Sequence, residues 1–303
     1  MIALKAILLI TCCKGLFSQQ GAKMREAKMD ITGMLRRPEF PRSAKYDPDW
    51  MMDNQMGPNA IWLMEWLCEA LDLKPGMRVL DLGCGKAITS IFLAKEFGAR
   101  VWAADLWIGP DLNWQRALEA GVPDLVCPIK AEAHALPFAQ GFFDAVVSAD
   151  AYQYFGTDDL YVDYLARFVK PGGALGVVVV GLMKELNAGL PASLTEPQKN
   201  GKAFWEASCR CFKTGEFWRS LWSGSSVVAG VAVDAQPEGW RHWRDFEQAV
   251  EAAGKSIFPS YAEALDRDRG ENICFLRLTA QRTEHPAENL YDPALGAKVG
   301  VDK

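Results

Sequence analysis

The feature that most restricts the fold of this chain is a regular alternation of strands and helices between Met77 and Val180. Short apolar segments of strand length are each followed by a segment in which apolar residues recur at helical spacing. Strands that alternate with helices form a parallel sheet, because each crossover helix packs on a face of that sheet. We therefore expect an α/β fold with a doubly wound, mostly parallel sheet and helices on both faces.

The last part of the sequence predicts the rest of the sheet. An irregular insertion at about 182–212 is followed by a helix over 215–223, a strand over 227–235, a helix over 240–253 and a final strand over 273–281. A strand pair that comes this late, after a series of parallel units, indicates a mixed sheet. We expect seven strands in total, one of them antiparallel.

Length and composition indicate one main domain. The chain has 303 residues, of which 50% are hydrophobic, enough for one large core with an elaboration. The predicted organisation is a disordered or non-native leader over 1–36, an N-terminal lid over 37–58, one α/β domain over 59–282 with insertions at about 182–212 and 238–270, and a flexible tail over 283–303.

The first residues do not predict a membrane anchor. Their apolar stretch is far shorter than the ~20 residues that span a bilayer, and Lys5 interrupts it, which is unlike a secretory signal. The eight cysteines lie mostly in apolar runs, as reduced thiols do in a cytoplasmic protein. Cys209 and Cys211 are the one suggestive pair, but a zinc site needs two further ligands at motif spacing, so we expect no metal.

The net charge of −5 provides no electrostatic footprint for nucleic acid, and no basic run stands out. We therefore expect a small-molecule partner, with neither nucleic acid binding nor stable membrane insertion. The sequence does not indicate an oligomeric state.

A glycine turn between a strand and a helix is the first candidate binding feature. The segment Val79–Ala87 runs from an apolar strand through Gly83 and Gly85, which allow a ligand to approach the backbone closely. The third glycine of a dinucleotide fingerprint is replaced by Ile88. Asp81 would repel a pyrophosphate but favour a ligand that carries an ammonium group.

A second acidic residue, Asp105, ends the next predicted strand. A carboxylate at that position can accept hydrogen bonds from both hydroxyls of a ribose. Trp107 lies two residues further on, where its ring can lie against an adenine face. The cofactor is therefore expected to be a nucleoside with a cationic end.

With these residues in order, the sequence resembles the class I (Rossmann-like) S-adenosylmethionine-dependent methyltransferases, in the group that includes small-molecule and cyclopropane-synthase-like members. The resemblance covers about 59–180 and implies S-adenosyl-L-methionine as the cofactor. It also implies which residues contact that cofactor: Asp81, Gly83, Cys84, Gly85, Asp105, Leu106, Trp107, Glu132, Ala133 and Asp150.

Two further segments carry the resemblance. Ala131 to Phe138 is similar to a family segment whose acidic residue bonds the adenine amino group, a role that falls on Glu132. The apolar strand over 143–148 and the later Lys170-Pro171-Gly172-Gly173 also follow the family pattern. The departures are mild: Ala87 stands where a third glycine is frequent, and Glu132 replaces an aspartate.

Methyl transfer from a sulfonium is an in-line displacement, so holding the reactants in line in a dry pocket supplies most of the catalysis. Where the acceptor must lose a proton, the candidate bases are Asp150, Tyr152, Tyr154 and His134. Each has a structural alternative: Asp150 can cap a turn, the tyrosines can pack, and His134 can be a loop residue. Cys84 is expected to fill space without a catalytic role.

The acceptor pocket is expected between the Tyr46–Met56 segment and the insertions near 182–212 and 240–253. These segments are rich in large side chains: Tyr46, Trp50, Met51, Met52, Phe204, Trp205, Trp218, Trp222, Trp240 and Trp243. Such rings suit an organic acceptor, although core packing explains them equally. The alternatives to a small-molecule methyltransferase are a methyltransferase of protein or RNA, a cofactor-binding homologue that lacks an acceptor cavity, and a nucleotide-dependent oxidoreductase, which Ile88 and Asp81 disfavour.

Overall fold

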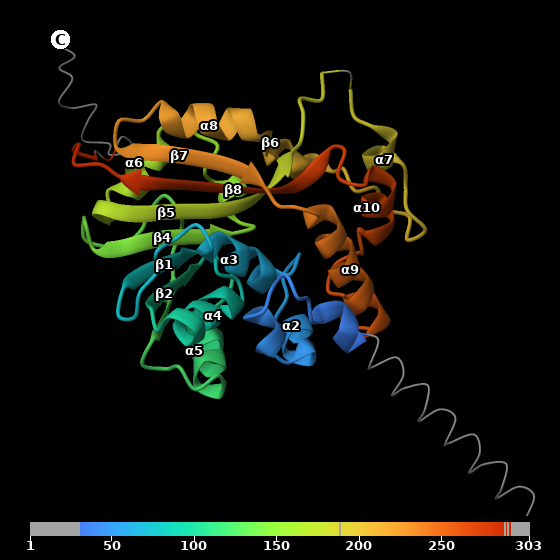
Figure 1. The fold of residues 1–303 in the computed structure, drawn as a ribbon, viewed down its shortest axis with the longest axis horizontal. Coiled ribbons are helices and arrows are strands. Elements are labelled where there is room, and N and C mark those ends of the chain that lie inside the picture. The colour runs from blue at the N-terminus through green and yellow to red at the C-terminus, as the bar shows by residue number, and fades with distance from the viewer. Residues whose placement is uncertain (1–30, 188, 288, 290, 292–303) are drawn as a thin grey trace, which may run out of the picture.

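The computed structural model describes residues 31–187, 189–287, 289 and 291. These residues form one sheet with helices on both of its faces (Figure 1). The strands are β1 (Arg78–Leu82), β2 (Arg100–Asp105), β3 (Val126–Lys130), β4 (Phe143–Ala149), β5 (Val169–Leu182), β6 (Lys213–Thr214), β7 (Val228–Ala235) and β8 (Ile273–Arg282). Besides the helical residues 31–35, the α-helices are α2 (Pro48–Asp53), α3 (Ala60–Cys68), α4 (Ile88–Phe97), α5 (Pro110–Glu119), α6 (Tyr161–Ala166), α7 (Ala192–Thr195), α8 (Gly215–Ser223), α9 (Gly239–Ala252) and α10 (Ala262–Asp268).

The strand order is β3-β2-β1-β4-β5-β8-β7. The first five strands are parallel, and β8 runs antiparallel to both β5 and β7. The predicted fold class is therefore confirmed, and the structure adds β6, a two-residue strand that pairs with β5. Because β1 pairs with both β2 and β4, the order of the strands reverses at β1, and ligands bind outside the carboxyl ends of strands at such a point.

Two apolar clusters hold the layers together. One cluster packs α3, α4 and α5 on one face of the sheet and continues into α9 and α10. The other cluster packs α6 and α8 on the opposite face. The central strands β1 and β4 are buried on both faces, which explains why they appear in the sequence as continuous apolar runs.

The N-terminal segment is part of the packed structure. Residues 31–35 are helical and Leu35 is fully buried, whereas the sequence predicted that the fold begins after Arg36. Glu65 of α3 anchors the next turn: its carboxylate accepts hydrogen bonds from the Arg42 and Ser43 amides at 2.8 and 2.7 Å and from the Ser43 hydroxyl at 2.5 Å. Leu35 and Phe40 therefore belong to the core. The rest of the predicted leader, 1–30, lies outside the described residues.

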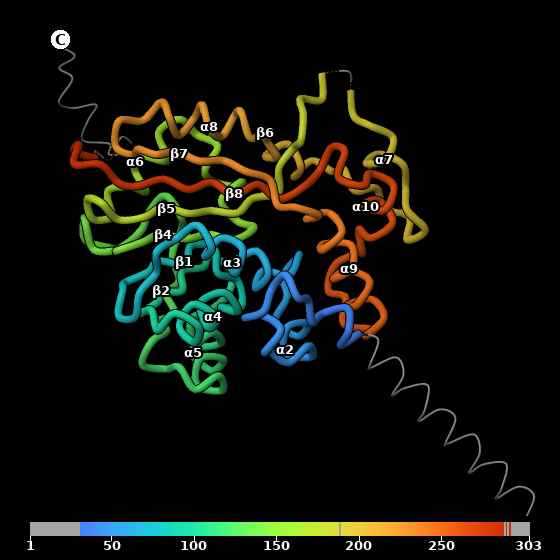
Figure 2. The backbone as a smooth tube through the Cα atoms, in the orientation of Figure 1, coloured from blue at the N-terminus to red at the C-terminus, as the bar shows by residue number. Residues whose placement is uncertain are grey.

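The predicted lid lies beside α9, far away in the sequence (Figure 2). Lys255, just beyond α9, forms ion pairs with Asp49 and Asp53 at 3.1 and 2.8 Å. Arg37 forms an ion pair with Asp245 of α9. The short helices α2 and α10 were not predicted, because a helix of six or seven residues shows too little of the helical period to be recognised.

The predicted tail makes contacts where the structure describes it. Tyr291 donates a hydrogen bond from its hydroxyl to Asp158 at 2.8 Å and packs against the cluster that holds α6. The Thr283 hydroxyl donates to the Ser226 carbonyl at 2.9 Å. The remainder of the tail, 288, 290 and 292–303, lies outside the described residues.

Candidate active site

The glycine turn between β1 and α4 needs residues without side chains. Gly83 and Gly85 have φ angles of 75° and 53°, in the left-handed region that favours glycine. A Cβ atom at residue 83 would lie 2.4 Å from the Cβ of Ala151, which follows β4. Ala87, at the position where a third glycine is frequent, also adopts a left-handed conformation with a φ of 58° as the N-cap of α4. The turn is therefore pressed against the end of β4.

Asp81 supports this turn from behind. Its side chain is only 1% exposed, and its Oδ2 accepts hydrogen bonds from the hydroxyls of Thr89 and Ser90, both at 2.6 Å. Burial raises the pKa of Asp81 to about 6. Asp81 does not line the cavity at the turn, in contrast to the sequence interpretation of a carboxylate in contact with the cofactor. Its Oδ1 is buried and has no hydrogen-bond partner in the described part of the chain.

Asp105 joins the turn to the end of β2. One carboxylate oxygen accepts from the Gly85 amide at 2.8 Å, and the other accepts from the amides of Trp107 and Ile108 at 2.8 and 2.9 Å. A carboxylate has about four lone-pair positions, so these three bonds leave capacity for a ligand hydroxyl. Unlike Asp81, Asp105 lines the cavity.

A side-chain network that the sequence did not reveal connects the turn to the N-terminal segment. Asn113 of α5 donates to the Gly85 carbonyl at 2.9 Å and accepts from Arg116 at 3.0 Å. Arg116 also donates to the Asn54 side chain at 2.9 Å, and Lys86 donates to the Asp53 carbonyl at 2.9 Å. The predicted lid is therefore fastened directly to the glycine turn.

A cavity of about 350 Å³ lies at this turn. Its wall contains eleven of the predicted site residues: Gly83, Cys84, Gly85, Asp105, Leu106, Trp107, Glu132, Ala133, His134, Asp150 and Tyr154. The N-terminal segment adds Met56 and Pro58 to the same wall. The structure therefore brings together the predicted site residues except Asp81 and Tyr152, which do not line this cavity.

A second cavity, of about 370 Å³, adjoins the first. The two cavities share Met56, Pro58, Trp107, Asp150 and Tyr154 as lining residues. The rest of its wall comes mainly from α9, from the segment before α10 and from the 182–212 insertion. A ligand in the first cavity can therefore present one end to a ligand in the second.

Asp150 lies at the junction of these cavities in an uncommon backbone conformation. It follows β4 with a φ of 55°, and its Oδ1 accepts a hydrogen bond from Gln153 Nε2 at 2.9 Å. Burial raises the pKa of Asp150 to about 7. A carboxyl group with this pKa can take up or release a proton near neutral pH.

The other candidate bases are placed differently. Tyr154 lines both cavities, and part of its side chain is exposed. Its hydroxyl is partly desolvated by the surrounding protein, and this desolvation is the main cause of its raised pKa. His134 lines the first cavity only, where its ring nitrogen lies 3.0 Å from the Glu132 carboxylate. Tyr152 is fully buried between Trp218 and Trp222, so it packs as core. Asp150 and Tyr154 are thus the candidates that face the second cavity.

The acceptor residues expected from the sequence were only partly correct. Phe204, Trp243 and Met56 line the second cavity. Met51 and Met52 are buried in the core. Trp218 and Trp222 belong to α8 and are buried on the opposite face of the sheet. Tyr46 and Trp50 line a separate hollow. Trp205 and Trp240 do not line the second cavity. Aromatic composition identified the segments but not which rings point inward.

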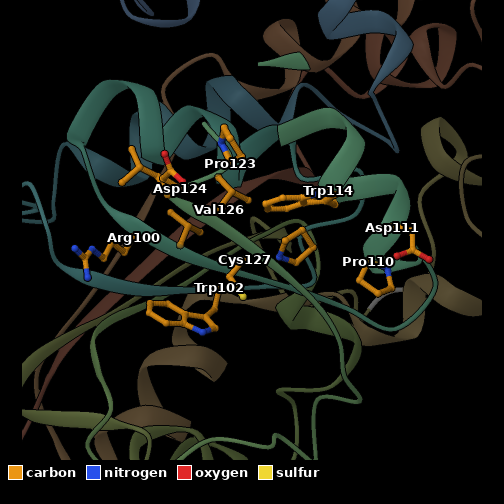
Figure 3. A pocket seen from close by; sticks show the side chains of 12 residues that line it. Arg100, Trp102, Pro110, Asp111, Trp114, Pro123, Asp124, Val126 and Cys127 are labelled. Atoms are coloured by element: carbon orange, nitrogen blue, oxygen red, sulfur yellow. The ribbon is translucent and has the colours of Figure 1, made fainter. Parts of the chain in front are cut away.

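Cys84 is buried beside the turn, and burial raises its thiol pKa well above the ordinary range, so the structure gives the thiol no reactive character. A third hollow lies away from the turn, between α5 and the edge strand β3 (Figure 3). Arg100, Trp102, Trp114 and Asp124 are among its lining residues, and it shares none with the two adjoining cavities. It is therefore separate from the candidate active site.

The segment that carries the glycine turn matches a known family: residues 79–173 correspond to the family described as a methyltransferase domain. This confirms the family predicted from the order of Asp81, Gly83, Gly85 and Asp105. Within the described residues, no helix has both the length and the apolar character that crossing a membrane requires.

Individual proteins match the methyltransferase domain over part of their length. The chain is 39% identical over 106 residues to 2-methyl-6-phytyl-1,4-hydroquinone methyltransferase from Synechocystis sp., which covers 35% of this chain and 32% of that protein. It is 35% identical over 122 residues to demethylmenaquinone methyltransferase from Mycobacterium sp., covering 40% of this chain and 49% of that protein. The matched region thus spans less than half of either relative.

The fold is shared more widely. The structure resembles geranyl diphosphate C-methyltransferase from Streptomyces coelicolor with a TM-score of 0.56 and 17% sequence identity, over 73% of this chain and 77% of that one. This likeness extends well beyond 79–173 and confirms the predicted α/β fold.

Proposed function

We propose that this protein is an S-adenosylmethionine-dependent methyltransferase that acts on a small-molecule acceptor. The observation that carries the proposal is the pair of adjoining cavities, which share Asp150, Tyr154 and Trp107 at their junction. One cavity has the glycine turn and the acidic strand end expected of a cofactor site. The other is lined by aromatic rings and has the size of a small-molecule site.

The first cavity fits the proposed cofactor. The turn at Gly83 and Gly85 leaves no Cβ atoms where the cofactor would meet the backbone. Asp105 keeps free lone pairs for ribose hydroxyls, and Glu132 lies in the same wall for the adenine. Trp107, 77% exposed, offers a ring face that a bound cofactor would cover. When bound, S-adenosylmethionine would supply an electrophilic methyl group, to which a nucleophilic acceptor would bond as the carbon–sulfur bond breaks in line, with S-adenosylhomocysteine as the leaving group.

The protein's own contribution is mainly to hold and enclose the reactants. The Asn113 and Arg116 network fixes the glycine turn against the N-terminal segment, so the two walls of the first cavity keep their spacing. Met56 and Pro58 close the junction and exclude water from it. Asp150 is placed to accept a proton from an acceptor that must lose one, because its carboxyl group faces both cavities.

The second cavity favours an enzyme over a cofactor-binding homologue that does not catalyse a reaction. Such a homologue was expected to lack room for an acceptor, and a cavity of about 370 Å³ beside the cofactor cavity provides that room. The relatives that match the methyltransferase domain are named for quinol-type acceptors. We propose a cytoplasmic location and leave the oligomeric state open.

Calorimetric titration with S-adenosylmethionine and S-adenosylhomocysteine tests the cofactor. We expect micromolar binding to the wild type and to Asp124→Ala, a matched control in the separate hollow at the sheet edge. We expect at least a tenfold loss in Asp105→Ala, because the three amides that Asp105 holds and the ribose would both lose their acceptor. Absence of binding to the wild type would overturn the proposal. Formation of S-adenosylhomocysteine with a panel of quinols, phenols and amines then tests methyl transfer.

A further inference from the structure

The second cavity has an aromatic wall that is separate from the glycine turn. Phe204, Trp243 and Tyr261 pack edge to face, with ring centroids 5.6 Å apart for Phe204 and Trp243, 5.0 Å for Phe204 and Tyr261, and 6.3 Å for Trp243 and Tyr261. The three rings come from the 182–212 insertion, from α9 and from the segment before α10. Faces of aromatic rings carry negative potential and attract organic cations.

The charged groups of this cavity all have the same sign. Asp150, Glu206 and Glu247 line it, whereas none of the described residues in its wall is lysine, arginine or histidine. Glu247 Oε1 accepts a hydrogen bond from Trp243 Nε1 at 3.1 Å, so this carboxyl group is held against the aromatic wall. At the junction, only Oδ1 of Asp150 is hydrogen-bonded within the described chain, which leaves Oδ2 open to a ligand.

Among the described residues, no lysine or arginine is a main influence on Glu247. Its side chain is largely buried, and this burial raises its pKa to about 7. A buried carboxylate without a cation is costly, and a cationic ligand would remove that cost. An anionic ligand would instead add a like charge to the same enclosed space.

We infer that the second cavity selects acceptors that carry a protonated amine on an apolar body, and that it rejects acceptors that carry a phosphate. The inference rests on the proposed function in that it takes this cavity as the acceptor site. The aromatic wall binds the body and the ammonium group, and the carboxylate of Glu247 pairs with the ammonium. Its competitor is a neutral quinol or alcohol, held by hydrogen bonds to protonated carboxyl groups.

Three probes of similar size separate these classes: phenethylamine, 2-phenylethanol and 2-phenylethyl phosphate. Each is titrated calorimetrically into the wild-type protein with and without saturating S-adenosylhomocysteine. We expect phenethylamine to bind at least about tenfold more tightly than 2-phenylethanol, and the phosphate to bind most weakly. Equal affinity for the amine and the alcohol, or no binding of any probe, would overturn the inference. So would tighter binding of the phosphate, whether alone or only after Mg²⁺ is added.

The Glu247→Gln variant tests the residue, with Glu216→Gln, an exposed position on α8 outside the second cavity, as the control. We expect Glu247→Gln to lose about tenfold in affinity for phenethylamine and to keep its affinity for 2-phenylethanol, while Glu216→Gln changes neither. Unchanged amine binding in Glu247→Gln would count against the inference. Binding of S-adenosylhomocysteine, measured on the same samples, shows whether the variants are folded. If the wild type did not bind S-adenosylhomocysteine, that result would refute the proposed function instead.

Discussion

Replacing Gly83 by alanine tests the close contact between the glycine turn and the end of β4. Two costs are expected at this position. An alanine with the observed φ of 75° costs about 1–2 kcal/mol relative to glycine, because its Cβ approaches the following carbonyl. A Cβ only 2.4 Å from the Cβ of Ala151 must also push the two segments apart, which costs about 1–3 kcal/mol more.

Gly121 provides the matched control. Its φ of 72° is nearly that of Gly83, but a Cβ added there would meet nothing within 4 Å. Gly121→Ala should therefore lower the free energy of unfolding by about 1–2 kcal/mol, and Gly83→Ala by about 2–5 kcal/mol. The difference between the two variants isolates the steric part of the effect.

Urea denaturation followed by tryptophan fluorescence measures both values. The double variant Gly83→Ala with Ala151→Gly completes a cycle, because removing the Ala151 Cβ removes the overlap and should restore most of the steric part. Affinity for S-adenosylhomocysteine should fall in Gly83→Ala and stay unchanged in Gly121→Ala. Equal destabilisation by the two single variants, with no coupling to Ala151, would show that the turn does not touch β4 in solution.

Three further predictions concern Asp81, Leu35 and Trp107. Because burial raises the pKa of Asp81 from 3.8 to about 6, the stability that its proton confers is complete below the unfolded-state pKa and is lost as pH rises through 6. The stability of the wild type relative to Asp81→Asn, measured by urea denaturation, should therefore fall between about pH 4 and pH 6 and then level off; a difference independent of pH would contradict this assignment. Leu35→Ala should lower the free energy of unfolding, measured by urea denaturation, by about 2–5 kcal/mol, because Leu35 is fully buried. The control Leu112→Ala, at an exposed position, should change it by less than about 0.5 kcal/mol, and similar values for the two variants would place Leu35 outside the core. Trp107→Ala should leave the melting temperature unchanged and weaken S-adenosylhomocysteine binding about tenfold in calorimetry. The control Trp114→Ala, in the separate hollow, should leave binding unchanged. Equal effects of the two variants on binding would show that Trp107 does not contact the cofactor.

Local sequence patterns predicted the fold well because the sheet is built from local units. The helix α4 belongs to the predicted alternation, and it ends at Gly98, a left-handed residue of the type that the sequence signals directly. The antiparallel β8 followed from its position after the parallel units. By contrast, the place of Leu35 in the core depends on contacts with distant segments, and no local pattern carries that information.

The sequence predicted some site residues correctly and others not, because the direction of a side chain also depends on contacts with distant segments. Adjacent residues of a strand point to opposite faces, but an acid at the end of a strand can turn either toward the cavity or toward the following helix. Asp105 lines the cavity, whereas Asp81 bonds the hydroxyls of Thr89 and Ser90 on α4. The second cavity was harder still, because its walls meet only when the N-terminal segment and α9 come together in space.

The backbone at Asp150 connects the fold to the proposed chemistry. Among the described residues, the non-glycine residues with a positive φ are Ala87, Asp150, Glu238 and Arg269. Three of them flank helices, as the N-cap of α4, the N-cap of α9 and the C-cap of α10, where a change of chain direction accounts for the conformation. Asp150 instead follows β4, beside Ala151, which contacts the glycine turn. A strained residue persists where its surroundings hold it, commonly at a functional site, and this strain directs the Asp150 carboxyl group to the junction of the two cavities.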